Sequence, residues 1–126
     1  MCSSDLTRVA QYWSQAPGTM ASMISNHDSF AGDRLWNQVQ GDLARYKLAA
    51  ATYLLQPGVP FIYYGEEIGM GRADFLQADA GLRTPMSWTA DSVRAGFTTG
   101  TPFRALSSNV SSQNVASQLE IGRAHV

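Results

Sequence analysis

The chain has 126 residues, enough for one ordinary domain, and its 44% hydrophobic and 15% charged residues are typical of a folded protein. Its formal net charge of −1 leaves no basic block to neutralise phosphates, which argues against nucleic acid or an anionic membrane as a partner and favours neutral substrates. No apolar run approaches the ~20 residues of a membrane span, and the single cysteine, Cys2, permits neither an internal disulfide nor a cysteine-based metal site.

The two ends of the chain mirror each other at the level of codons. Residues 1–6 can be encoded by ATG TGC TCT TCC GAT CTC, and the reverse complement of that string translates as residues 120–125. We therefore expect residues 1–6 and 120–126 to derive from a sequencing adapter, and residues 7–119 to carry the fold.

The first part of the chain predicts a helix followed by a buried strand. Residues 7–15 have a weak helical spacing of apolar side chains, which a Pro-Gly pair terminates. Residues 19–25 are almost continuously apolar, as is typical of a parallel strand covered on both faces, and the polar tripeptide Asn26-His27-Asp28 follows directly. We expect a loop or a short helix over residues 29–39.

The next part contains the most regular helical pattern. Residues 41–56 are rich in alanine and leucine, Asp42 is a good N-cap, and a second Pro-Gly pair marks the end. Residues 61–64 predict a second strand, with acidic residues directly after it. A long loop should follow, and residues 106–118 should lead into a further helix.

Polar side chains follow both predicted strands. Strand, helix and strand in this order indicate an α/β protein of the (β/α)8 TIM barrel type, in which catalytic residues lie at the carboxyl ends of the strands. Because a complete barrel requires ~250 residues, we expect this chain to hold a partial barrel.

Several motifs resemble the α-amylase family of glycoside hydrolases (family thirteen) in their order and spacing. They are Asn26-His27-Asp28, residues 57–70 (PGVPFIYYGEEIGM), residues 83–88 (RTPMSW), residues 95–99 (AGFTT) and residues 114–118 (NVASQ). The resemblance implies that residues 7–119 hold the seventh and eighth βα units of a catalytic barrel, with a long loop after the eighth strand.

Asp28 is the strongest catalytic candidate. A lone Asp after a strand more often caps a turn, but the adjacent His27, the strand-end position and the downstream motifs favour a catalytic role. Retaining glycosidases pass through an oxocarbenium-like transition state between a nucleophile and a general acid. The resemblance implies that Asp28 is a third carboxylate that stabilises this state, and that His27 hydrogen-bonds to sugar hydroxyls. Arg34 is a weaker substrate-binding candidate, because an ordinary surface charge explains it equally well.

Other reactive-looking residues have plainer explanations. Glu66 and Glu67 are expected to be buried or to anchor a loop, because adjacent strand residues point to opposite faces and cannot both address one sugar. No spacing of histidines and carboxylates predicts a metal site, so no cofactor is expected in this segment, although the resemblance allows calcium in a longer parent. Four aromatic residues fit sugar stacking and core packing equally well, namely Tyr64, Trp88, Phe97 and Phe103.

The expected function follows from the resemblance. It implies that the nucleophile and the acid/base lie on the fourth and fifth strands of a longer parent, so that this chain alone is inactive. The parent is expected to cleave α-glucosidic bonds of starch-like or malto-oligosaccharide substrates, as an α-amylase or α-glucosidase does. A trehalose synthase-like transglycosylating isomerase is an alternative, because such enzymes share the later motifs. A non-catalytic barrel subunit is a second alternative. The presence of His27 and Asp28 argues against it.

Overall fold

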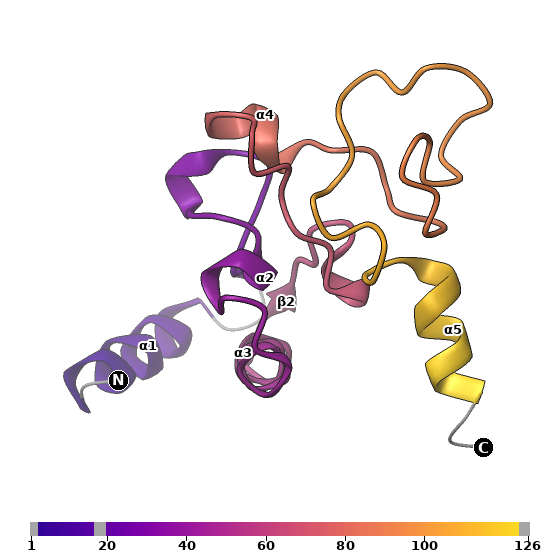
Figure 1. Cartoon of the computed structure of the whole chain (residues 1–126). Coiled ribbons are helices and arrows are strands. Elements are labelled where there is room, and N and C mark those ends of the chain that lie inside the picture. The colour runs from indigo at the N-terminus through magenta and orange to yellow at the C-terminus, as the bar shows by residue number, and fades with distance from the viewer. Residues whose placement is uncertain (1–2, 17–19, 124–126) are drawn as a thin grey trace.

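A computed structural model describes residues 3–16 and 20–123 of the chain (Figure 1). Helix α1 lies on one side of the molecule and α5 on the other, with the remaining elements between them (Figure 1). In chain order the elements are α1 (Ser3–Gln15), β1 (Ala21–Ser22), η1 (Ser29–Ala31), α2 (Leu35–Gln38), α3 (Leu43–Leu54), β2 (Val59–Pro60), η2 (Glu66–Ile68), α4 (Ala78–Leu82) and α5 (Val115–Arg123). None of the described helices is long and apolar enough to cross a membrane.

The two strands form a parallel pair, with Ala21 opposite Val59. The Phe61 N–H extends the ladder by donating to the Ser22 carbonyl over 2.8 Å. Parallel strands cannot be joined by a tight turn, and here α3 makes the connection between them. The predicted order of strand, helix and strand is therefore present as one βαβ unit.

The second strand differs from its prediction over residues 61–64, because the strand is Val59–Pro60 and its ladder ends with the bond from the Phe61 N–H. Tyr63 explains the difference. Its carbonyl accepts from the Glu66 N–H over 2.9 Å and its N–H donates to Glu66 Oε2 over 3.2 Å, so its backbone closes a turn instead of extending a ladder. The first strand is also shorter than predicted, and Thr19 lies outside the described residues.

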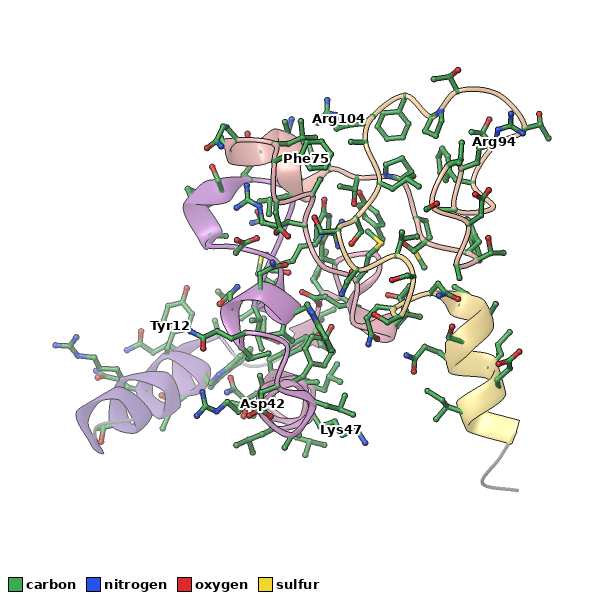
Figure 2. All side chains as sticks on the ribbon, viewed as in Figure 1. Tyr12, Asp42, Lys47, Phe75, Arg94 and Arg104 are labelled. Atoms are coloured by element: carbon green, nitrogen blue, oxygen red, sulfur yellow. The ribbon has the colours of Figure 1, made fainter. Side chains whose placement is uncertain are left out.

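Helix α3 begins where its capping residue predicts (Figure 2). The Asp42 carboxylate accepts from the N–H groups of Ala44 and Arg45 over 2.9 and 3.0 Å, which satisfies two of the donors that every helix leaves free at its N-terminus. Helical spacing predicts that one face of this helix, Leu43, Tyr46, Ala50, Tyr53 and Leu54, points toward the barrel. Tyr46 and Tyr53 are buried, whereas Leu43 and Leu54 are exposed, so the predicted inward face is incomplete.

The long segment after β2 contains two short helices that the sequence did not predict, the 3-10 helix η2 and α4. Elsewhere, side chains order its backbone. The Asn109 amide accepts from the Gly71 N–H over 2.9 Å and donates to the Gly69 carbonyl over 3.0 Å, while the Ser107 hydroxyl donates to the Gly71 carbonyl over 2.8 Å. These bonds satisfy backbone groups that have no strand or helix partner.

Many large apolar side chains of the βαβ unit have no cover within the described residues. On β1, β2 and the residues that follow them, and on α3, the exposed ones are Met23, Leu43, Leu48, Leu54, Leu55, Val59, Phe61 and Ile62. Contiguous apolar surface and unpaired strand edges both promote association.

We therefore expect residues 7–119, expressed alone, to aggregate or to remain partly unfolded. Thermal unfolding and the dispersion of the amide NMR spectrum would test this expectation. A cooperative transition together with a dispersed spectrum would contradict it, because the exposed apolar side chains would then need no additional strands to cover them.

Candidate functional site

Asp28 lies between β1 and η1, directly before η1 begins at Ser29. It occupies the N-cap position of η1 in an extended conformation, and its side chain is 35% exposed. The Asn26 side-chain oxygen accepts from the Asp28 N–H over 2.7 Å, which fixes the turn of the tripeptide. Asn26 therefore shapes the turn, and Asp28 presents a fixed and accessible carboxylate.

Arg83 brings a positive charge to this carboxylate from 55 residues further along the chain. Its Nη2 lies 2.5 Å from Asp28 Oδ1 and 2.9 Å from Asp79 Oδ2, and its Nε donates to the His27 carbonyl over 2.9 Å. Hydrogen bonding from Ser29, and then the charge of Arg83, hold the pKa of Asp79 below its usual value. One guanidinium thus joins both carboxylates to the backbone of the tripeptide.

His27 completes the exposed part of the site. Its Nε2 lies 3.4 Å from Asp28 Oδ2, and its side chain is 63% exposed. A cavity of about 250 Å³ adjoins it, lined by Met23, Ser25, Asn26, His27, Phe61, Ile62 and Tyr63. Imidazole and carboxylate together offer both a donor and acceptors, a combination that suits a neutral polyhydroxy ligand.

Near the tripeptide, Glu66 is the centre of a buried hydrogen-bond network. Its carboxylate accepts from the hydroxyls of Ser25 and Tyr53, the latter over 3.1 Å, and from the Tyr63 N–H over 3.2 Å. Its backbone carbonyl accepts from the Tyr46 hydroxyl over 2.5 Å. The prediction of a buried or loop-anchoring acid is confirmed for Glu66, which is 4% exposed, whereas Glu67 is exposed.

The tyrosines around this network have altered titration. Burial and then the charge of Glu66 raise the pKa of Tyr53 to about 12 and raise the pKa of Tyr46 further. Burial also raises the pKa of Tyr63. All three hydroxyls therefore stay protonated in the folded protein at pH values where free tyrosine ionises.

Arg34 is completely buried, with no exposed surface. Its Nε and Nη2 donate to the Leu82 carbonyl over 3.1 and 2.7 Å, and its Nη1 donates to the Tyr64 carbonyl over 2.8 Å. The guanidinium carbon lies 4.6 and 4.8 Å from the ring centroids of Tyr63 and Tyr64. The structure therefore favours an anchoring role for Arg34 over the predicted contact with substrate.

The aromatic residues considered for sugar stacking differ in their contacts and exposure. Tyr64 is committed to structure, because its hydroxyl donates to the Thr84 carbonyl over 2.5 Å and its ring covers Arg34. Phe97 and Phe103 pack against each other with ring centroids 5.8 Å apart, and both remain partly exposed, as does Trp88.

Sequence reasoning missed Arg83 and Asp79 as members of the site. Arg83 opens the RTPMSW motif, so a signal was present, but that motif served only to establish the resemblance. Nothing in the sequence placed Asp79 opposite Ser29, whose N–H donates to Asp79 Oδ1 over 2.7 Å. Within the described ranges, no group of three or more histidine, cysteine, aspartate or glutamate residues fits a metal ion.

Comparison with known proteins gives the family. The family model described as alpha amylase, catalytic domain, matches residues 2–126. Oligo-1,6-glucosidase from Heyndrickxia coagulans is 34% identical over 145 aligned positions, which cover 87% of this chain and 26% of that protein. Trehalose synthase from Thermus thermophilus is 47% identical over 62 residues, 49% of this chain and 6% of that protein. Alpha-amylase 3 from Dictyoglomus thermophilum is 41% identical over 71 residues, 56% of this chain and 13% of that protein.

Solved structures agree in fold. Trehalulose synthase from Pseudomonas mesoacidophila MX-45 superposes with a TM-score of 0.74 at 24% identity, over 91% of this chain and 27% of that one. A variant of isomaltulose synthase from Erwinia rhapontici NX5, solved with sucrose, gives 0.71 at 24% identity, over 88% of this chain and 26% of that one. The chain thus spans about a quarter of these structures.

The fold is that of part of a (β/α)8 barrel. The chain belongs to the α-amylase family of glycoside hydrolases, whose matched members here include hydrolases and enzymes named as synthases of disaccharides.

The contrast between the two adjacent glutamates gives a stability prediction. In the full-length protein, Glu66→Ala should lower the free energy of unfolding by about 3 kcal/mol, because it leaves buried donors without an acceptor. Glu67→Ala, at an exposed position, is the matched control and should change the free energy of unfolding by about 0.5 kcal/mol or less. Urea unfolding measures both, and equal losses would contradict the proposed network.

The raised tyrosine pKa values give a pH prediction. An unfolded tyrosine ionises near pH ~10, whereas Tyr53 does so at about 12 when folded, so the unfolded state releases its proton first. The free energy of unfolding should therefore decrease as the pH rises from about 10 to about 12, and Tyr53→Phe should make this decrease with pH less steep. Urea unfolding at stepped pH tests this, and superimposable slopes for the two proteins would refute it.

Proposed function

We propose that this chain forms the seventh and eighth βα units of a retaining glycoside hydrolase that cleaves α-glucosidic bonds of starch-like or malto-oligosaccharide substrates. Asp28 is its transition-state stabiliser, and His27 binds the sugar at the cleaved bond. The observation that carries the proposal is the Asp28 carboxylate, which lies between β1 and η1, is bound by Arg83 and is flanked by His27. The family membership supplies the class of reaction.

The site chemistry fits this role. A glycosidic transition state gains positive charge on the sugar ring as the bond to the leaving group breaks. The Asp28 carboxylate can accept hydrogen bonds from sugar hydroxyls that strengthen in that state. Arg83 and the Asn26 side chain hold Asp28 in place beforehand, so little reorganisation is needed as the reaction proceeds.

The other catalytic groups are proposed to come from outside this chain. The matched relatives are several times longer than the aligned segments. We infer that the nucleophile and the acid/base belong to the fourth and fifth strands of a longer parent, and that residues 7–119 alone are inactive. Residues 1–6 and 120–126 are proposed to be adapter-derived.

The functional test uses Asp28→Asn in the full-length enzyme. This change keeps the shape of the side chain and removes its charge, so turnover of α-linked glucosides should fall by about 10²–10³-fold, with a smaller effect on KM. His27→Ala should have a smaller effect, since it removes a neutral contact. Steady-state kinetics on maltose, with product analysis for glucose and trehalose, measures the rate and separates hydrolysis from isomerisation.

Asp74→Asn is a matched control, because Asp74 is an exposed aspartate in the loop before α4 whose backbone N–H, rather than its carboxylate, bonds to the Ser108 hydroxyl over 2.9 Å. Its turnover should match that of the unmodified enzyme. Unchanged turnover in Asp28→Asn as well would remove Asp28 from the site and leave it as a turn residue.

A further inference from the structure

Phe30 is 85% exposed, the highest value among the phenylalanines of the chain. Single exposed apolar side chains are common on protein surfaces, so exposure alone assigns no role. Its position does distinguish it. Phe30 lies two residues after Asp28, so their Cα atoms are at most about 7.6 Å apart. A sugar held at Asp28 would therefore have Phe30 within reach of the next sugar unit.

The backbone on both sides of Phe30 is fixed relative to the Asp28 carboxylate. The Ser29 N–H donates to Asp79 Oδ1 over 2.7 Å, and Asp79 shares Arg83 with Asp28. The Ala31 N–H donates to the Asp28 carbonyl over 3.2 Å. An aromatic ring carried on such a segment loses less freedom on binding a ligand than one on an unrestrained loop.

The proposed role of His27 indicates which sugar unit Phe30 meets. His27 lines the cavity of about 250 Å³ beside the tripeptide, whereas Phe30 comes after Asp28 and is not part of that lining. Because His27 is proposed to bind the sugar at the cleaved bond, the exposed Phe30 is positioned for the next unit, which leaves to solvent or arrives from it.

We propose that Phe30 is the stacking surface for the sugar unit on the leaving side of the cleaved bond, and that it thereby sets which acceptor receives the glucosyl group. This inference rests on the proposed role of Asp28. The flat apolar face of the ring matches the C–H face of a pyranose, and aromatic surfaces with a few polar groups are the usual lining of such ligand sites. Phe30 is thus a specificity-determining residue of the reaction.

The test compares two substrates in the full-length enzyme. Maltose has a sugar as its leaving group, whereas α-glucosyl fluoride has none. Phe30→Ala should lower kcat/KM for maltose by about tenfold and leave α-glucosyl fluoride unchanged. It should also lower the yield of transfer to added glucose. Phe30→Tyr should preserve both activities, and Phe30→Leu, which keeps apolar bulk without a flat ring, should behave like Phe30→Ala.

Two controls separate this inference from the proposed function. Phe75→Ala removes another exposed ring, in the segment before α4, and should leave the ratio of the rates on the two substrates unchanged. Asp28→Asn should slow both substrates. If Phe30→Ala alters both substrates equally or neither, the stacking role is overturned while the result for Asp28→Asn still stands. If Asp28→Asn slows neither substrate, the proposed function fails instead.

Discussion

The buried carboxylate of Glu66 is the interaction on which the described structure most depends. It accepts hydrogen bonds from Ser25 before the tripeptide, from Tyr53 on α3 and from the Tyr63 backbone after β2. A buried carboxylate is costly unless its lone pairs are satisfied, so these three segments must approach it together. Strand, crossover helix and second strand are thereby fixed at the end where the tripeptide emerges.

Charged residues from later in the chain complete the exposed site next to the Glu66 network. Arg83 and Asp79 come from the segment after β2, yet they bind the backbone and side chains around Asp28. Their contacts with Asp28 and Ser29 span about half of the chain, which explains why the order of the long loop matters for the site. Because partly exposed ion pairs stabilise a fold weakly, the main effect of this pairing is to position the carboxylate.

What the sequence predicted well was local in origin. The start of α3 follows from Asp42 and the two N–H groups directly after it, and the buried tyrosines follow from helical spacing. Asp28 and His27 were chosen as site residues because they stand beside each other after a predicted strand, and their roles stay a prediction. The strand limits were predicted poorly, because Tyr63 leaves the ladder for a turn that Glu66 closes through its backbone N–H and its side chain.

The two arginines show the limit of such reasoning most clearly. Arg34 stands six residues after Asp28 and invites a functional role, yet it is buried against the carbonyls of Leu82 and Tyr64. Arg83 stands far away in sequence and makes the contact with Asp28. Arg34 meets backbone carbonyls of the segment after β2, whereas Arg83 belongs to that segment and meets the Asp28 carboxylate. Proximity in sequence therefore favoured Arg34, and only the path of that segment shows that Arg83 is the arginine that contacts Asp28.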